Sequence, residues 1–409
     1  MRLLLFAPLL AALPGAATAG PLTFEAALYQ AQTTAPSLRA RALGADAARS
    51  ARGAAGALPD PTLAVGVDGF PISGPLAFEP GRDDFTMTRV GIAQEFPNLA
   101  KRHAQQARAD TDIAAAEADR AVEARTVEVG AALAWINLAY AERRLAALDD
   151  LLARLDRVVG VTSGAVSSGN ARPAQTLAGR QAVAALQDRR AALVSQAARA
   201  RAALTRWTSE PDPETAGPLP DFAVDPVLLK AGLDAHPSIR MIDAQGAQAD
   251  ADVRVAEAGR RPDFGVNLAY QRRDPRFGDY VSAGVTISLP IFTRRRQGAG
   301  IGAAQAQAGR VAAEREAARR ALAADLDADL ADHVMHRDQW MRARDTLRPL
   351  AEERVRLETA SYAAGRAGLV DIADAYAALA EATLATLERE AAVAADGARL
   401  SLTYRRTDQ

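Results

Sequence analysis

Every second residue is apolar in the stretch FGVNLAYQ, which occupies residues 264–271. The alternation continues in YVSAGVTISL at residues 280–289, where one set of positions is mostly apolar and the other is small or polar. Two different faces are typical of β-strands that meet different environments on their two sides. We therefore predict a β-hairpin over residues 263–290, with Phe264 and Phe292 at one end and Tyr270 and Tyr280 near its turn.

A fainter copy of this hairpin lies over residues 60–96. Leu63, Val65 and Val67 alternate clearly, whereas the second strand is less regular because Met87 and Arg89 share a face. Strands of about 9 to 11 residues with one lipid-facing side are typical of outer-membrane barrels. Two soluble hairpins packed on helices remain the alternative.

Two long runs of helix-forming residues follow the hairpins, at residues 98–163 and 297–362. The first contains no proline, and in the second Pro349 should kink or end the helix. At a rise of about 1.5 Å per residue, each run spans roughly 100 Å. Helices in compact domains average about 11 to 12 residues, so these lengths indicate a coiled coil or a tube. A soluble antiparallel coiled coil fits this part of the sequence equally well.

The two halves of the chain repeat each other. APSLR at residues 35–39 recurs as HPSIR at 236–240, and AGALPD at 55–60 recurs as AGRRPD at 258–263. Each half is thus predicted to contain a helix, a hairpin, a long helix, a turn and a return helix. The repeats occupy residues 20–208 and 226–409, and a proline-rich linker at residues 209–225 joins them.

The first 19 residues have the order of a cleaved secretory signal peptide. Arg2 precedes an apolar run over residues 3–13, and small residues at 17–19 form a cleavage site. The rest of the chain has no run of about 18 to 20 apolar residues, so we expect it to enter a membrane only as strands.

Composition excludes several classes of protein. The chain has no cysteine, so we expect no disulfide, no thiolate metal site and no lipid anchor on an N-terminal cysteine. Its 49 basic and 50 acidic residues balance, which gives no sign of nucleic-acid binding. No phosphate loop, zinc-protease helix or nucleophile elbow is present, so we predict neither an enzyme nor a cofactor.

Four strands are too few to close a membrane barrel by themselves, since known single-chain barrels need at least about eight. A dimer would supply eight strands around a filled interior, whereas three copies would supply twelve and leave a lumen. The predicted fold is mainly α with a small β part. Its two repeats of long coiled-coil helices and hairpins would form, in a homotrimer, a 12-strand membrane β-barrel and a periplasmic α-helical barrel.

The most specific motif is YAAG at residues 362–365, followed by GLVDIADA at 368–375. Together with the repeat, it resembles the TolC-like outer-membrane efflux family, over essentially the whole mature chain. The resemblance implies an outer-membrane channel that contacts outer-membrane lipid and extends a tube into the periplasm. There it would dock a membrane-fusion adaptor and an inner-membrane pump. The implied docking residues at the periplasmic tip are Val166, Ser167, Gly169, Tyr362, Gly365, Arg366, Gly368 and Leu369.

A narrower resemblance lies in the first hairpin. LPDP at residues 58–61, FPISG at 70–74, TMTRVG at 86–91 and QEFP at 94–97 are similar to the heavy-metal resistance branch of that family. This implies export of cobalt-, zinc- or cadmium-type cations. A drug or protein export duct of the same family is the first alternative, and a soluble periplasmic coiled-coil scaffold or adaptor is the second.

Asp371 and Asp374 are three residues apart and therefore share one face of a helix. In a trimer they would form two rings of three carboxylates at the narrow end of the tube, which would attract cations. We predict that they form the pore constriction and set its selectivity. The alternative is that they cap the returning helix, where acids are favoured by the helix dipole.

Two further groups of charged residues have weaker interpretations. His333 and His336, beside Asp329 and Asp332, have a spacing that suits a divalent metal, but such pairs are usually solvated and we predict no metal site. Arg294–Arg296 and the pair at residues 101–102 follow the strands. They would meet anionic groups at the inner membrane face, pair with acids of a neighbouring chain, or remain solvated.

Overall fold

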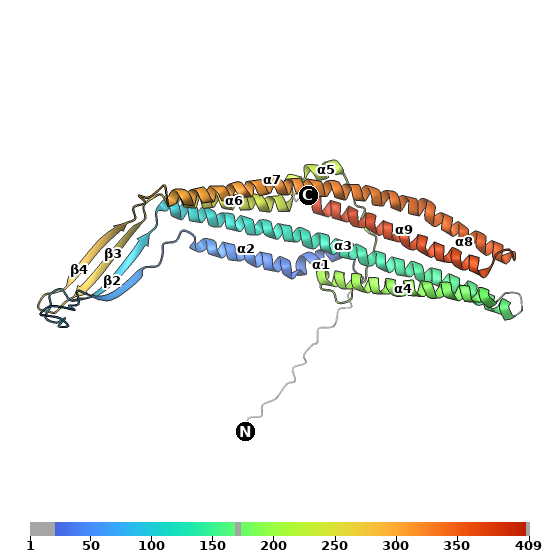
Figure 1. The fold of residues 1–409 in the computed structure, drawn as a ribbon, viewed down its shortest axis with the longest axis horizontal. Helices are drawn as coiled ribbons and strands as arrows, with labels where there is room; N and C mark the ends of the chain where they lie inside the picture. Colours follow the sequence, from blue (N-terminus) through green and yellow to red (C-terminus); the bar gives the residue numbers. More distant parts are fainter. Residues whose placement is uncertain (1–20, 168–172, 406–409) are drawn as a thin grey trace, which may run out of the picture. The chain divides into compact units, whose positions relative to one another are not determined.

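The computed structural model describes residues 21–167 and 173–405, and the side chains of 159–176 and 178 are not described. The protein is mainly helical and has one small antiparallel sheet (Figure 1). Its elements are α1 (Phe24–Thr34), α2 (Pro36–Ala54), β1 (Thr62–Asp68), β2 (Met87–Phe96), α3 (Leu99–Ser167), α4 (Pro173–Thr208), α5 (Pro226–Ala231), a 3-10 turn (Leu233–Ala235), α6 (Pro237–Ala258), β3 (Phe264–Arg272), β4 (Tyr280–Ile287), α7 (Gln297–Arg342), a π-helical turn (Ala343–Leu347), α8 (Arg348–Ala363) and α9 (Leu369–Tyr404).

This architecture confirms the predicted fold class, with long helices and one hairpin in each repeat. The signal-peptide prediction at residues 1–19 lies outside the described residues. None of the helices in the described part of the chain combines the length and the apolar character of a membrane-spanning helix.

The chain forms two compact units, and each contains segments of both repeats. The strand unit comprises Pro36–Arg125, Pro226–Asp327 and Tyr404–Gln409. The helical unit comprises Met1–Ala35, Thr126–Asp225 and Ala328–Thr403. The repeats are therefore units of sequence and not separate compact bodies, because helices of one repeat pack against helices of the other.

The sheet of the strand unit has the order β1-β2-β3-β4, and every neighbouring pair is antiparallel. Its register sorts the side chains onto two faces. Leu63 lies opposite Ile92, Ile92 opposite Leu268, and Leu268 opposite Ala283. The neighbouring row contains Ala64, Gly91, Ala269 and Ser282, so one face is apolar and the other is small or polar.

The second strand, which looked irregular in the sequence, fits this scheme. Val90 and Ile92 lie on the apolar face, and Met87 and Arg89 share the small-residue face, where Arg89 pairs with Asp68 of β1 at 3.3 Å. The apparent irregularity is therefore one ion pair on the polar side of the sheet.

The helical unit has an ordinary buried core in two clusters. The first surrounds Trp135, which lies edge-on to Phe24 and donates a hydrogen bond from Nε1 to the Leu22 carbonyl at 2.8 Å. Figure 1 shows the second cluster's helices α3, α4, α8 and α9 running alongside one another. Its fully buried members include Leu148, Leu155 and Ile372.

The proline-rich linker is packed rather than free. Its Thr215 forms a parallel bridge with Leu22, and the Thr215 hydroxyl donates to Glu142 at 2.6 Å. Phe222 packs edge-on against Phe24. Composition alone predicted a linker here, and these contacts attach the segment to the core of the helical unit.

The second long helix is interrupted close to Pro349, where we predicted a kink or an end. A π-helical turn at Ala343–Leu347 separates α7 from α8. Proline has no backbone N–H, so it cannot donate to the carbonyl four residues earlier, at Asp345. A single wide turn is a common way to absorb such a break.

Candidate functional site

The α8–α9 turn, residues 364–368, is fixed by a hydrogen-bonded helix ending. The Arg366 N–H donates to the Ser361 carbonyl and the Gly365 N–H to the Tyr362 carbonyl, both at 2.9 Å. This pair of bonds is the Schellman motif, which needs a left-handed residue at the position of Gly365. Gly365 has φ of 69°, a conformation that costs glycine nothing.

Asp371 closes the other side of the turn. Its carboxylate accepts a hydrogen bond from the Gly368 N–H at 2.7 Å, which satisfies a backbone donor at the start of α9. An acid at the third helical position reaching back to the cap residue is half of a capping box. The capping alternative for Asp371 is therefore present in this structure, and it is compatible with an exposed carboxylate.

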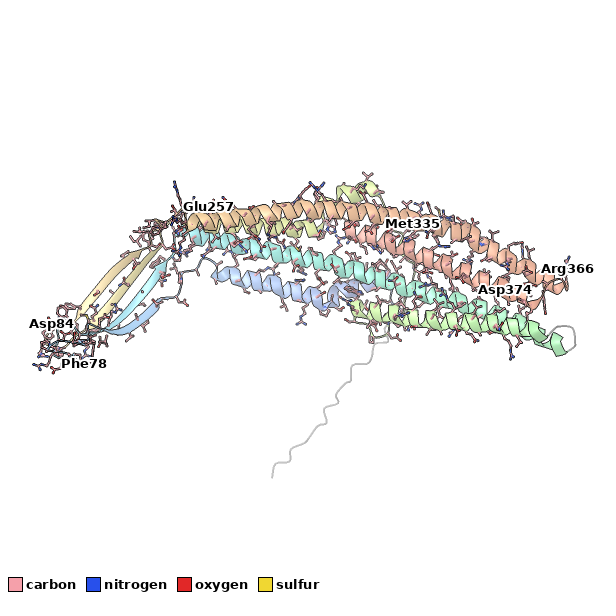
Figure 2. All side chains as sticks on the ribbon, viewed as in Figure 1. Phe78, Asp84, Glu257, Met335, Arg366 and Asp374 are labelled. Atoms are coloured by element: carbon pink, nitrogen blue, oxygen red, sulfur yellow. The ribbon has the colours of Figure 1, made fainter. Side chains whose placement is uncertain are left out.

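The first turns of α9 have one buried face and one exposed face. Leu369, Ile372 and Tyr376 are buried, and the last two belong to the cluster formed with α3 and α4. Asp371 and Asp374 are exposed. Figure 2 shows Arg366 at the outer end of the turn and Asp374 farther along α9. Burial of one face therefore fixes the direction of the two carboxylates.

The exposed acids continue along α9 beyond the predicted pair. Glu381 and Glu388 follow Asp374 at intervals of seven residues, and both are exposed. A spacing of seven places them on one side of a helix, two turns apart. The acidic stripe, defined as Asp371, Asp374, Glu381 and Glu388, was missed in the sequence, although the sevenfold spacing could have revealed it.

The structure brings together the predicted residues of the second repeat only. Tyr362, Gly365, Arg366, Gly368 and Leu369 lie in or next to the α8–α9 turn. Their first-repeat counterparts are Val166 and Ser167, the last residues of α3, whose side chains are not described, and Gly169, which lies outside the described residues.

The histidines of α7 form a helix–helix contact. His336 Nδ1 lies 2.7 Å from a carboxylate oxygen of the buried Asp396 on α9, and Asp329 lies 3.4 Å from Arg399. Burial lowers the pKa of His333. The described residues contain no group of three His, Cys, Asp or Glu side chains that would hold a metal ion. The solvated-face interpretation is wrong for His336, because this side chain contacts Asp396. Local spacing could not reveal the contact, since the two residues are 60 positions apart in the sequence.

The basic residues that follow the strands have two different environments. Lys101 pairs with Asp263 at 3.2 Å, and Arg102 donates from Nε to the Gly56 carbonyl at 2.7 Å. Arg294–Arg296 are exposed. The interpretation as a solvated cluster is therefore wrong for Lys101 and Arg102, because both side chains bind partners in the same chain.

Asp263 is the residue that sequence reasoning missed. It accepts hydrogen bonds from the Asn98 backbone N–H at 2.7 Å and side chain at 2.9 Å, and its own N–H donates to Ser288 Oγ at 2.7 Å. Burial alone would raise its pKa, but these bonds and Lys101 outweigh burial and hold the pKa below its usual value. It joins the first repeat to the second where strands meet helices, and the repeated Pro-Asp dipeptide was the available signal.

A known protein family matches the part of the chain that contains the second hairpin and the α8–α9 turn. Residues 228–403 match the outer membrane efflux protein family. The matched region runs from α5 to the end of α9 and contains β3, β4 and the α8–α9 turn. No curated protein matches the chain.

Solved structures share the fold over nearly the whole chain. The outer membrane channel CmeC of Campylobacter jejuni superposes with a TM-score of 0.77 at 13% identity, covering 93% of this chain and 85% of that one. The MtrE outer membrane channel of Neisseria gonorrhoeae gives 0.75 at 19% identity, with 93% and 88% covered. CusC, whose structures concern transmembrane channel formation, gives 0.79 at 14%, with 93% and 91% covered. At these identities the likeness concerns the fold.

Proposed function

We propose that this protein is a homotrimeric outer-membrane channel, the export duct of a tripartite efflux system. The observation that carries the proposal is the open four-stranded sheet. Its apolar side chains are exposed over the whole of one face, for example Leu63 at 72% and Leu268 at 51%. Leaving such a side chain in water is less favourable than burying it by about 1.5 to 3 kcal/mol. Lipid would cover this face without that cost.

The two edges of the sheet support assembly. β1 and β4 each pair with a single strand among the described residues, so each leaves one edge open. Unpaired backbone groups in lipid cost several kcal/mol each, and a closed barrel removes them. In the proposed trimer, β4 of each copy pairs with β1 of the next, giving twelve strands. Small residues such as Gly91 and Gly284 would then line the lumen.

The α8–α9 turn supports the remaining partners. It is a compact helix hairpin with a fixed backbone and exposed side chains, such as Arg366, which suits docking to the helices of an adaptor. The adaptor would connect the duct to an inner-membrane pump. We propose that the turn predicted for the first repeat contributes Val166, Ser167 and Gly169 to the same docking region.

We propose heavy-metal cations as the cargo. The motifs of the first hairpin and the acidic stripe motivate this choice, because carboxylates around a lumen raise the local concentration of cations. Deleting the gene should then reduce tolerance to heavy metals more than to lipophilic drugs. Unchanged metal tolerance with lost drug or peptide export would move the protein to another branch.

Disulfide trapping tests the trimer directly, since the natural chain has no cysteine. Ala64→Cys on β1 should be combined with Ser282→Cys or Gly284→Cys on β4, all on the small-residue face. Oxidation in membranes should give linked dimers and trimers and nothing larger, while each single variant stays monomeric. Ladders beyond three copies, or monomers from every pair, would overturn the proposal. Single-channel conductance of the purified protein in a planar bilayer would complete the test.

A further inference from the structure

Five arginines gather at the end of the sheet where the strands meet the long helices. Arg260 and Arg261 lie a few residues before β3, and Arg294–Arg296 follow β4. Asp263 and Ser288 hold these two segments together, because the Asp263 N–H donates to Ser288 Oγ at 2.7 Å and the Ser288 N–H donates to the Asp263 carbonyl at 2.9 Å. We call the five residues Arg260, Arg261 and Arg294–Arg296 the junction arginines.

The junction arginines are exposed, and their side chains make no hydrogen bond or ion pair with any other described residue. The acid closest to them in the sequence, Asp263, is already taken by Asn98 and Lys101. Five guanidinium groups with no anion of their own repel one another, since like charges close together raise the electrostatic energy. An external anion would relieve that repulsion.

Apolar side chains lie beside these charges. Ile291 and Phe292 are exposed, Phe292 at 73%, and only Thr293 separates them from Arg294. The Arg296 N–H donates to the Phe292 carbonyl at 3.2 Å, so this segment forms a helical turn. Residues three or four apart in such a turn share a side, which places Phe292 beside Arg295 and Arg296. Exposed apolar and basic side chains are therefore neighbours at this end of the sheet.

The hairpin end of the same sheet is different. Arg276 pairs with Asp274 at 2.8 Å, Arg82 with Glu79 at 2.9 Å, and Arg273 donates to the Asp84 carbonyl at 3.1 Å. Three arginines at that end are therefore satisfied within the chain, whereas the Arg272 side chain is exposed and makes no hydrogen bond or ion pair with another described residue. Arginine without a partner is concentrated at the junction end of the sheet.

We propose that the junction arginines bind the headgroup phosphates of anionic glycerophospholipids in the membrane leaflet on the helix side. The inference rests on the proposed membrane location of the sheet. Guanidinium groups suit phosphate because their planar donors can bind two oxygens at once. Ile291 and Phe292 would lie among the first methylenes of the acyl chains, where amphipathic borders of membrane proteins place such residues. The lipid would thereby fix the depth of the barrel in the membrane.

The test uses the purified full-length protein in neutral detergent micelles, with dioleoyl-phosphatidylglycerol as the probe and dioleoyl-phosphatidylcholine as the neutral comparison. The variant is Arg294→Gln, Arg295→Gln and Arg296→Gln together. The matched control is Arg82→Gln, Arg273→Gln and Arg276→Gln, which removes the same charge from the hairpin end. Native mass spectrometry measures the lipids retained by each trimer and their affinity.

Each arginine near an anionic surface contributes roughly a fivefold factor at low salt, and salt screening reduces it. The junction variant should therefore lose on the order of tenfold or more in phosphatidylglycerol affinity, with phosphatidylcholine binding unchanged, and the control should lose less than threefold. Equal losses in both variants, or no loss, would overturn the inference. So would a junction variant that falls apart in lipid-free micelles, since its arginines would then pair with a neighbouring copy.

Conductance separates this inference from the proposed function. If the junction variant still conducts in phosphatidylcholine vesicles but no longer prefers phosphatidylglycerol, both the channel and the lipid site are supported. If the natural protein never conducts, the channel proposal fails. The lipid measurement in micelles still decides the arginine site.

Discussion

The strand unit and the helical unit place their large apolar side chains in opposite environments. In the helical unit Trp135, Leu148 and Ile372 are fully buried among other helices. In the strand unit the apolar row that includes Leu63, Val65 and Leu268 is exposed. Since both units belong to one chain, the difference indicates that they are built for different surroundings. The core of one is protein, and the apolar face of the other needs a covering that the described part of a single chain does not provide.

The largest effect should come from the core of the helical unit. Trp135 is 1% exposed and its Nε1 donates to the Leu22 carbonyl, so Trp135→Ala removes both packing and a hydrogen bond. We expect a loss of about 3 to 5 kcal/mol in the free energy of unfolding. Chemical denaturation followed by circular dichroism measures it. The control Tyr29→Ala, at a side chain 69% exposed, should cost about 0.5 kcal/mol or less.

The reverse test applies a charge to the apolar face of the sheet. Leu268→Arg should cost about 2 to 4 kcal/mol if the face lies in lipid, because a guanidinium is poorly solvated there. The yield of trimer in outer-membrane fractions, assayed by heat-modifiable electrophoretic mobility, should fall sharply. Asn267→Arg, one residue away on the small-residue face, should be tolerated. Equal tolerance of both variants would mean that water covers both faces.

Local sequence patterns were sufficient to predict most of the fold. Period-two alternation located both hairpins, and the scarcity of proline located the long helices, because both signals depend on residues close together in the chain. The hairpin of the second repeat, predicted over residues 263–290, contains strands at Phe264–Arg272 and Tyr280–Ile287. Pro349 identified the break in the second long helix to within a few residues.

The sites were only partly predictable, because their partners are distant in sequence. Spacing correctly placed Asp371 and Asp374 on one exposed face of a helix, but not the hydrogen bond that Asp371 accepts from Gly368. Asn98 and Asp263 are 165 residues apart, and His336 and Asp396 are 60 apart. No periodicity connects such pairs, so tertiary structure was needed to find them.

A smaller effect is expected where the two repeats meet. Asp263→Ala removes the acceptor for Asn98 and the partner of Lys101, and should reduce the free energy of unfolding by about 1 to 2 kcal/mol. Asp60→Ala, at the equivalent position of the first repeat, removes an exposed acid whose side chain makes no hydrogen bond or ion pair with another described residue, and should cost about 0.5 kcal/mol or less. Equal costs would mean that the junction bonds contribute no stability.

The same residue predicts a pH dependence. The pKa of Asp263 is lower in the folded protein than its usual value, so the folded state favours the ionised carboxylate. Its stabilisation is complete above the ordinary aspartate pKa of about 3.9 and is lost as the pH falls through the lower folded pKa. The free energies of unfolding of the natural protein and Asp263→Asn should therefore be closest in strong acid and reach their full difference above about pH 4.

The smallest effect on stability, and a large one on function, should come from the acidic stripe. Asp374→Asn removes a charge that has no partner bond among the described residues, so it should leave folding unchanged. Asp371→Asn keeps an oxygen that can accept from the Gly368 N–H, at a cost of about 0.5 kcal/mol or less. Reversal potentials across a salt gradient measure the selectivity of the double variant.

Three copies of each aspartate around a narrow opening would repel one another, and entering cations would relieve that repulsion. The double variant should therefore lose most of its preference for cations while still forming trimers. Glu381→Gln with Glu388→Gln is the matched control, because it removes the same charge from the same face of α9 farther from the turn. If the constriction lies at the turn, the control should change selectivity much less, since pore charges act most strongly where the pore is narrowest. Equal effects of both pairs would mean that the whole stripe lines the lumen without a constriction at the turn, and no effect of either would place α9's acids outside it.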